Sequence, residues 1–237
     1  MYPYLNRSAI THCRFTENAG AYGLLQMQCW GTNSSLCSAS FTNSTFIRHS
    51  GCKYGAVFLQ TTRSSFRYST FHLNTADSGG AIGATSCAVS VDDCSFSSNS
   101  ALSYGGAIDL NSAAKCPISR STFTNNSAVG GHGGAVAAFA VTNASVVDCH
   151  LSHNRAGSNG GCINVEGASS GITVDRSNLS HNTAQVHGEV FTSLLQLLIL
   201  VSLAVISRRI QLKESGGAVY FEATSSKMGV TGVFELL

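Results

Sequence analysis

The sequence predicts an all-β protein, a right-handed parallel β-helix of about seven coils with one apolar insert that we expect to be helical. Three observations predict this fold. A motif recurs with a period of about 25 to 31 residues, short alternating segments connect its copies, and glycine precedes each apolar run. With 237 residues the chain is long enough for a sizeable core, and only 11% of its residues are charged, against about 25% in an average soluble domain.

Each copy of the motif begins with a large apolar anchor. Asn follows three positions later in every copy except the second, which has His49, and a short run of glycine and apolar residues comes next, such as "GGAI" or "GGAV". Repetition of this kind predicts a solenoid, because a single unit is too small to bury its own apolar face. The anchors are Phe15, Phe46, Phe71, Phe96, Phe123, Leu151 and Leu179.

The connecting segments have the composition of strands. "CAVSVDDCSF" (87–96) and "ASVVDCHL" (144–151) alternate Ser, Thr and Val with few helix formers. We expect two or three short strands in each coil, stacked about 4.8 Å from the next coil, with Phe, Ile and Val facing inward.

A fixed slot in a solenoid lies above itself in the next coil, so the repeated Asn should form a ladder of side-chain amides while adopting a left-handed turn conformation. Glycine before the apolar run should allow a tight corner that a Cβ would block. The predicted ladder residues are Asn74, Asn99, Asn126, Asn154 and Asn182.

The pairing of F-x-x-N with G-G-A-[ILV] resembles the repeats of the polymorphic outer membrane proteins of chlamydiae, and related right-handed β-helix proteins of the pectate-lyase-like superfamily. The resemblance covers residues 13 to about 222, and the first two copies are degenerate. It implies a surface-exposed or secreted module with a structural, adhesive or interaction role, whose partner is a protein or glycan at a cell surface. The alternative is a carbohydrate-active enzyme, a polysaccharide lyase or hydrolase of the pectate-lyase-like type.

The net charge and the cysteine content limit the partners and the cellular location that we expect. The net charge is +2 and no basic run precedes Arg208 and Arg209, so we expect no nucleic-acid partner. Nine cysteines without C-x-x-C spacing favour an oxidising, extracellular or cell-surface location, and the resemblance implies the outer membrane. The start, "MYPYLNRSAITHC", contains no apolar signal-peptide segment. Six N-x-S/T sequons agree with a secreted glycoprotein: Asn6, Asn33, Asn43, Asn125, Asn143 and Asn178.

The sequence contains few candidate catalytic or metal-binding residues, and we expect no cofactor. Glu166 and Glu222 share a slot in the repeat and are the candidates for a catalytic acid and base, although we interpret them as solvated carboxylates on an outer face. His153 and His181 lie in identical "LSHN" contexts and are the candidates for metal ligands. Two histidines without a third ligand make a poor metal site, so stacked polar residues beside the Asn corner are the simpler interpretation.

The cysteines suggest two disulfides. Cys87 and Cys116 fall in equivalent turns of adjacent coils, and Cys29 with Cys37 could close a loop in the irregular second repeat. We expect the other cysteines to be small buried apolar residues.

One segment breaks the pattern. Residues 190–206 are apolar and uncharged, at the lower limit of length for a membrane span, and Arg208, Arg209 and Lys213 follow. However, "SGGAVYF" then supplies the second half of the seventh repeat. We therefore favour an insertion into a coil over an anchor, and divide the chain into β-helix repeats (1–184), apolar insert (185–213) and remainder of the last coil (214–237).

Overall fold

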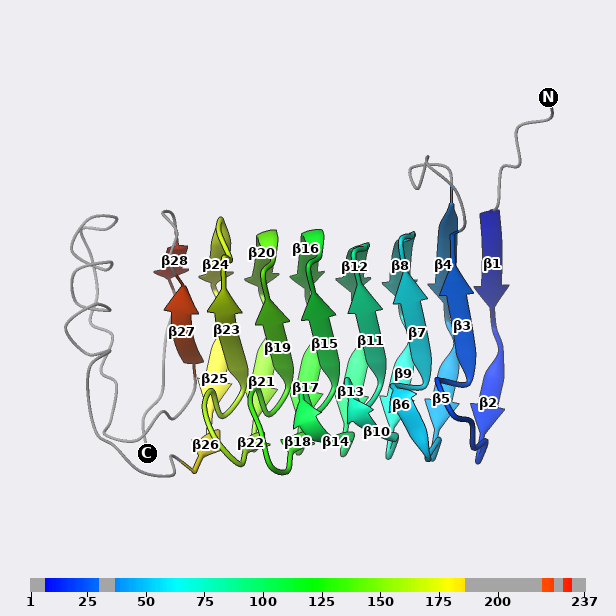
Figure 1. Ribbon diagram of the computed structural model, residues 1–237, viewed down its shortest axis with the longest axis horizontal. Coiled ribbons are helices and arrows are strands. Elements are labelled where there is room, and N and C mark those ends of the chain that lie inside the picture. The colour runs from blue at the N-terminus through cyan, green and yellow to red at the C-terminus, as the bar shows by residue number, and fades with distance from the viewer. Residues whose placement is uncertain (1–6, 30–36, 186–218, 224–227, 232–237) are drawn as a thin grey trace.

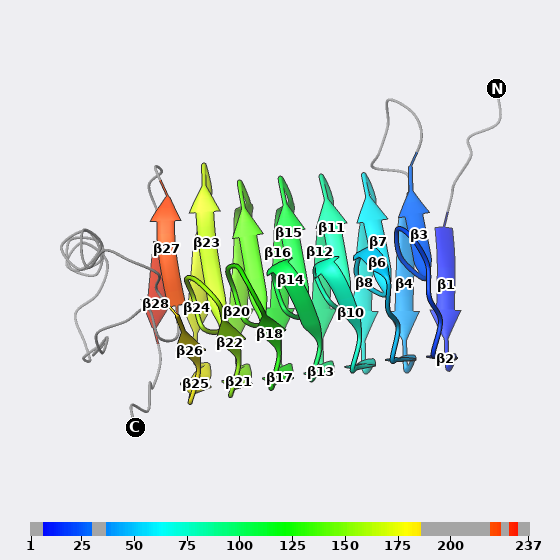
Figure 2. The ribbon, with the colours of Figure 1, turned by 60° about the horizontal axis from the view of Figure 1, so that its bottom comes forward.

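Four parallel sheets run along the molecule, and each coil of the chain passes through them in turn. The computed structural model describes residues 7–29, 37–185, 219–223 and 228–231. Within these residues every element is a strand, and Figures 1 and 2 show the strands of each sheet stacked side by side along one axis. The predicted all-β parallel β-helix is confirmed.

Sheets 1 and 2 form consecutive walls of the coil. Sheet 1 contains β1 (Arg7–Thr11), β4 (Ser38–Thr42), β8 (Arg63–Arg67), β12 (Ala88–Asp92), β16 (Ala114–Ser119), β20 (Thr142–Val147), β24 (Ile172–Asp175) and β28 (Met228–Thr231). Sheet 2 contains β2 (Arg14–Thr16), β5 (Thr45–Ile47), β9 (Thr70–His72), β13 (Ser95–Ser97), β17 (Thr122–Thr124), β21 (His150–Ser152) and β25 (Asn178–Ser180).

Sheets 3 and 4 complete the coil. Sheet 3 contains β6 (Cys52–Tyr54), β10 (Thr75–Ser78), β14 (Ser100–Tyr104), β18 (Ser127–Ala128), β22 (Arg155–Ala156) and β26 (Thr183–Ala184). Sheet 4 contains β3 (Leu25–Gln28), β7 (Val57–Gln60), β11 (Ile82–Thr85), β15 (Ile108–Asn111), β19 (Val136–Phe139), β23 (Ile163–Gly167) and β27 (Val219–Ala223).

The number of complete coils follows from sheet 3, which is 6-stranded. In the described part of the chain, the first coil has no strand there and replaces it with the single bridge between Ala19 and Ser50, and β28 begins a further turn. The solenoid therefore has about six complete turns, where the sequence predicted about seven.

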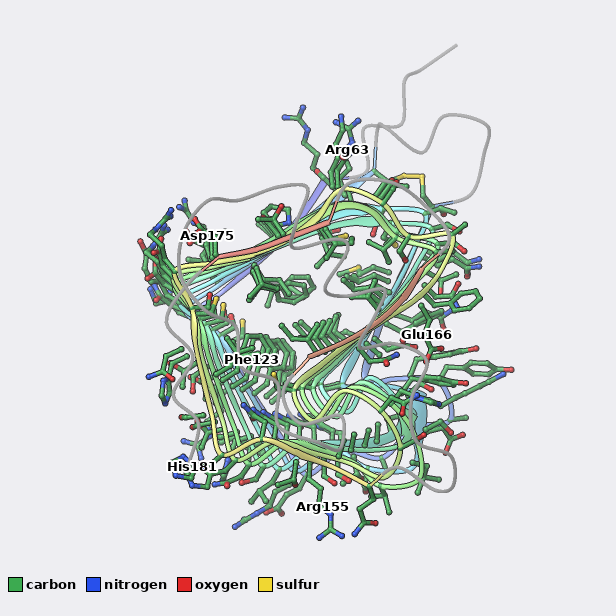
Figure 3. The ribbon with its side chains drawn as sticks, turned by 90° about the vertical axis from the view of Figure 1, so that its left-hand side faces the viewer. Arg63, Phe123, Arg155, Glu166, Asp175 and His181 are labelled. Atoms are coloured by element: carbon green, nitrogen blue, oxygen red, sulfur yellow. A yellow bond between two sulfur atoms is a disulfide. The ribbon has the colours of Figure 1, made fainter. Side chains whose placement is uncertain are left out.

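The core is the interior of the coil. The rings of Phe46, Phe71, Phe96 and Phe123 stack face to face with centroids 4.7 to 4.9 Å apart, and Leu151 and Leu179 continue the same column in register. Figure 3 looks along the axis and shows Phe123 inside the coil, whereas Glu166 and His181 lie outside. Stacked rings bury a large apolar area in a single geometry, so they fix the register between coils.

In the four coils from β8 to β23 the chain turns four corners, and each corner uses a residue with a left-handed backbone. In the coil of β12 to β15 these residues are Ser86, Asp93, Ser98 and Gly105, with φ of 54°, 50°, 54° and 58°. The fourth corner takes glycine because a Cβ on Gly105 would overlap the carbonyl oxygen of Ile108. The left-handed residue at the Asn corner is the one before the Asn, such as Ser98 before Asn99, and not the Asn itself as the sequence suggested.

Residues 186–218 lie outside the described part of the chain, and with them nearly all of the predicted apolar insert. The chain leaves β26 at Ala184 and takes its place in sheet 4 again at Val219, which pairs with Ile163. Among the described residues no helix is long and apolar enough to cross a membrane. The division into three segments stays a prediction.

Candidate functional site

The five predicted Asn residues lie in one hydrogen-bonded column. Each side-chain amide donates to the side-chain oxygen of the next coil, at 2.9 Å from Asn74 to Asn99, 3.0 Å to Asn126, 3.0 Å to Asn154 and 2.9 Å to Asn182. The same nitrogen also donates to the carbonyl of the previous coil's anchor, as Asn99 does to Phe71 at 3.0 Å. In Asn74, Asn99, Asn126 and Asn154 both amide hydrogens have a partner and the side chain is fully buried, so these residues have a structural role.

His49 occupies the same column in place of Asn. Its Nδ1 lies 3.2 Å from the backbone nitrogen of Asn18, and its Nε2 lies 3.2 Å from the carbonyl oxygen of Phe15. One ring nitrogen thus accepts and the other donates, as an amide does, which requires the neutral tautomer with the proton on Nε2. Burial lowers the pKa of His49, against the opposing effect of its backbone hydrogen bonds.

A second column, made of serine and cysteine, lies beside the anchors. Ser121 Oγ accepts from the backbone nitrogen of Cys94 at 3.1 Å, and Ser177 Oγ accepts from that of Cys149 at 3.1 Å. Burial raises the pKa of both thiols to about 11, so they are inert side chains of the wall.

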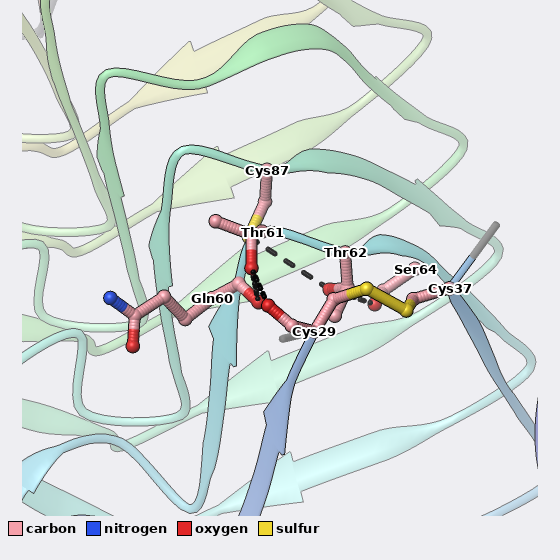
Figure 4. The surroundings of a disulfide bond; sticks show 7 residues. All are labelled: Cys29, Cys37, Gln60, Thr61, Thr62, Ser64 and Cys87. Atoms are coloured by element: carbon pink, nitrogen blue, oxygen red, sulfur yellow. Dashed lines mark hydrogen bonds between the residues drawn. A yellow bond between two sulfur atoms is a disulfide. The ribbon is translucent and has the colours of Figure 1, made fainter. Parts of the chain in front are cut away.

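Cys29 and Cys37 are joined by a disulfide with a Cα–Cα distance of 5.9 Å, shown in Figure 4. Thr61 Oγ1 donates to the carbonyl oxygen of Cys29 at 2.8 Å and ties this region to the next coil.

The predicted pair of Cys87 and Cys116 is wrong, because both are free thiols. β16 is longer than β12, and Val91 pairs with Ile118, so Cys116 lies beside Val89. Cys87 instead lies beside Ala113. The carbonyl oxygen of Cys87 accepts from the backbone nitrogen of Ala114, and that of Ala113 accepts from Thr142, so the two residues hold equivalent positions in adjacent coils.

His153 and His181 stack face to face, with ring centroids 4.7 Å apart and an interplanar angle of 1°. Both are exposed at the corner that precedes the Asn column. Within the described residues no group of three or more His, Cys, Asp or Glu side chains is placed to hold a metal. Among the described residues the pair thus offers two nitrogens and no third ligand.

Ion pairs line the corner between sheets 1 and 2. Asp92 accepts hydrogen bonds from Ser119 at 2.7 Å and from Arg67 at 2.9 Å, and also pairs with Arg120. Burial would raise the pKa of Asp92, but these hydrogen bonds and the positive charges outweigh it and lower the pKa. Arg67 and Arg120 line a shallow depression with Ser65, Ser90 and Pro117. Both arginines are already paired with carboxylates, so the depression offers little free positive charge to an anion.

Glu166 does not extend freely into solvent as the sequence suggested. Its side chain is 18% exposed, and one carboxylate oxygen lies 3.3 Å from Nδ1 of His132, outside hydrogen-bond geometry. His132 precedes the glycine corner of its coil and stacks on Tyr104 of the preceding coil, with ring centroids 5.6 Å apart. Glu222 pairs with Glu166 in the strand register, as its shared slot in the repeat predicted.

Two further polar groups on sheet 4 make no hydrogen bond with the described protein. Asn164 is 1% exposed, lies on the same face of β23 as Glu166, and its Oδ1 has no partner. Asp109 lies on this face of β15, two coils away, and its register neighbours are Gly83 and Ala137. Burial raises the pKa of Asp109 to about 7.

These residues define the outer face of sheet 4. In β3, β7, β11, β15, β19 and β23 the outward positions are Gln26, Gln28, Phe58, Gln60, Gly83, Thr85, Asp109, Asn111, Ala137, Phe139, Asn164 and Glu166. Tyr104, His132 and the glycine corners border it, and Phe139 and Tyr104 are 49% and 43% exposed. Figure 3 shows Glu166 at this outer wall. The face carries carboxylates, amides and rings, and none of its described side chains is Lys or Arg.

Sequence reasoning missed His132, Asn164 and the border formed by Tyr104. A signal for them exists in the repeat: Tyr22, Tyr54, Tyr104 and His132 all stand directly before a corner glycine. Asn164 stands in the outward slot after "GGCI", where the other repeats carry Gln26, Phe58, Gly83, Asp109, Ala137 and Tyr220.

The fold and these columns define a class, the parallel β-helix repeat proteins. Two segments, residues 93–110 and 120–138, match the family model described as the Chlamydia polymorphic membrane protein repeat. Each matched segment contains one F-x-x-N and one G-G-A-[IV] motif, in two adjacent coils. The chain is thus a parallel β-helix protein in which these two segments match the polymorphic membrane protein repeat. No curated protein and no solved structure gives a significant match.

Proposed function

We propose that this protein is a surface-displayed β-helix module that binds a partner along the outer face of sheet 4 and carries out no chemistry on it. The repeat type and the solenoid fit a surface protein with a structural or interaction role. One observation carries the choice of face. Both buried side-chain atoms that lack a hydrogen-bond partner in the described chain, Nδ1 of His132 and Oδ1 of Asn164, lie here. Elsewhere the polar columns are bonded within the stack.

Unpartnered buried polar atoms are costly, and proteins keep few of them without a use. A partner that supplies donors at these positions would recover that cost on binding. Exposed rings at the same face would add apolar contact area, as Tyr and Phe do at many interfaces.

The alternative is a carbohydrate-active enzyme. The contact between Glu166 and His132, and a carboxyl at Asp109 that titrates near neutral pH, are the features that favour it. Asp109 and Glu166 lie on strands two coils apart, about 10 Å, and His132 and the register neighbour Glu222 are titratable residues next to Glu166. Among the side chains that the structure describes, no second carboxylate lies beside Glu166, and the side chain of Glu222 is outside that set.

Incubation of the purified protein with acidic and neutral polysaccharides separates the two. The module hypothesis expects saturable binding to a surface partner and no cleavage products, in both the wild type and Glu166→Gln. Cleavage by the wild type that Glu166→Gln abolishes would replace the proposal with the enzyme. Glu17→Gln, at an exposed glutamate paired with Arg48, is the control for loss of one negative charge.

A further inference from the structure

The outer face of sheet 4 offers hydrogen-bond acceptors and rings but no fixed cation. Glu166 and Asp109 supply carboxylates, and Asn164 supplies an amide oxygen that no described protein group uses. In the described part of the chain, Lys53 lies near the border of this face but toward the first coils, with its Nζ 5.2 Å from the ring centre of Tyr54. The part formed by β15, β19 and β23 therefore needs donors from outside.

We infer that this part of the face binds the ammonium group of a lysine side chain on a partner protein, with Glu166 and Oδ1 of Asn164 as its acceptors. The inference rests on the proposed function, since it names the chemistry of the partner at the proposed face. An ammonium has three donors and no acceptor, which matches a site made of acceptors. The exposed rings of Tyr104 and Phe139 suit the same ligand, because the face of an aromatic ring attracts a cation.

The burial of Asn164 is what separates this site from a mere group of acidic residues. The side chain is 1% exposed and lies between the core residues Ile163 and Val165 in sequence, but on the opposite face of the strand. Its Oδ1 is withdrawn from solvent without a donor, so a partner group that reaches it gains a hydrogen bond that bulk water supplies poorly. Ala137 lies between Asn164 and Asp109 in the register and carries no polar side-chain group that could donate to them.

Asp109 supports a second contact further along the same face. Burial raises the pKa of its carboxyl to about 7, and its register neighbours Gly83 and Ala137 carry no charge. A second lysine of an extended partner would supply a positive charge there. The separation of two coils, about 10 Å, lies within the reach of lysines a few residues apart in an extended segment.

Two other partner types fit less well. A polyanionic saccharide would meet carboxylates and find no described Lys or Arg on the face. A neutral saccharide could donate hydroxyl hydrogens, but its own acceptors would have few donors to meet. The net charge of the chain is +2, so a lysine-rich peptide gains nothing from long-range attraction to the whole protein.

The test is a titration of the full chain with a short peptide that alternates lysine and glycine, followed by calorimetry and by the side-chain amide resonance of Asn164. The matched peptide carries acetylated lysines, and an uncharged oligosaccharide is the third probe. We expect the lysine peptide to bind and shift the Asn164 resonance, and the acetylated peptide to bind at least about tenfold more weakly.

Variants separate the site from general charge. Glu166→Gln and Asn164→Ala should each weaken the lysine peptide about fivefold or more, whereas Glu17→Gln, which removes the same charge at the other end of the solenoid, should leave its affinity unchanged. Equal weakening by Glu166→Gln and Glu17→Gln would overturn the site, as would no binding at all. Binding of the oligosaccharide alone would overturn the lysine assignment and leave the interaction module standing, whereas its cleavage would overturn the proposed function itself.

Discussion

Asn126 shows how a single residue holds two coils together. Its side-chain oxygen accepts from the backbone and side-chain nitrogens of Asn99, both at 3.0 Å. Its side-chain nitrogen donates to Phe96 and to Asn154, again at 3.0 Å. An amide is the side chain that can do both at one slot, which is why the repeat keeps Asn there.

Replacing Asn126 by Ala should lower the free energy of unfolding by about 1 to 3 kcal/mol, because the buried backbone nitrogen of Asn99 loses its acceptor. A chemical melt measures the change. Asn178→Ala is the matched control, since Asn178 is exposed on β25, and it should stay within about 0.5 kcal/mol of the wild type. Equal losses in the two variants would mean that the column does not stabilise the stack.

His49→Asn should flatten the pH dependence of stability. Burial lowers the folded-state pKa of His49 below 6.5, so the unfolded chain takes up the proton first as pH falls. The contribution of neutral His49 is therefore present above about pH 6.5 and is lost as pH falls toward the folded-state pKa.

Urea midpoints at about pH 7.5 and about pH 5 should differ less in His49→Asn than in the wild type. His153→Asn changes an exposed histidine and should leave the difference unchanged. A wild-type slope that His49→Asn does not reduce would show that His49 is not a neutral substitute for Asn in the column.

The Asn column could be predicted from sequence because a fixed offset from a buried anchor fixes a slot in space. The left-handed residue before each Asn could not, because Glu17, Arg48, Leu73, Ser98, Asn125, His153 and His181 share no side-chain chemistry. In the sequence His49 interrupts the Asn pattern. In the structure it takes the place of Asn in the column, since its two ring nitrogens reproduce the donor and the acceptor of the amide.

At the scale of the element, the corners decide where each strand ends. Two or three strands per coil were predicted and four are present, because strands as short as β13, β17 or β22 are too brief for alternation to be visible. The failed Cys87 and Cys116 pair has a similar origin. The longer β16 shifts the register before Ile118, and a sequence repeat does not show such a shift.

Gly105→Ala should destabilise the protein much more than Gly51→Ala. Both glycines have positive φ, 58° and 72°, so alanine is strained at each by about 1 kcal/mol or more. Only at Gly105 would the new Cβ also overlap the carbonyl oxygen of Ile108, whereas at Gly51 it meets nothing within 4 Å. We expect a loss of about 3 kcal/mol or more for Gly105→Ala in a thermal or chemical melt. Similar losses in the two variants would show that the corner can relax around a methyl group.

At the scale of the whole molecule, the stack continues across the segment that the structure does not describe. β26 ends at Ala184, β27 begins at Val219, and β27 pairs with β23 along its length. In other coils the same connection is made by residues 79–81 or 157–162. Deleting residues 185–213 would leave residues 214–218 to make this connection. Its length would then lie between the lengths of the other two connections.

The deletion variant should therefore keep its β-rich circular dichroism, melt no lower than the parent and be more soluble, because an apolar stretch is removed. A membrane anchor predicts another result: the full chain would resist alkaline extraction from membranes, and residues 214–237 would be protected from protease on the cytoplasmic side. Loss of surface display on deletion, together with that protection, would contradict the insertion interpretation.

The candidate face was the least predictable feature. Tyr104, His132 and Glu166 are separated in sequence and come together because successive coils place the glycine corner beside the outer face of sheet 4. The sequence named Glu166 but placed it in solvent, since nothing in a strand pattern reveals that His132 reaches it.

Native-state hydrogen exchange tests most directly the central claim that polar side chains hold the coils in one continuous stack. The backbone amides of Asn74, Asn99, Asn126 and Asn154 each donate to a side-chain oxygen of the following coil, so we expect them to exchange slowly and as one cooperative unit. Asn126→Ala should raise the exchange rate most at Asn99. Fast exchange at these amides, or independent exchange of the coils on either side of Asn126 in the wild type, would contradict the account.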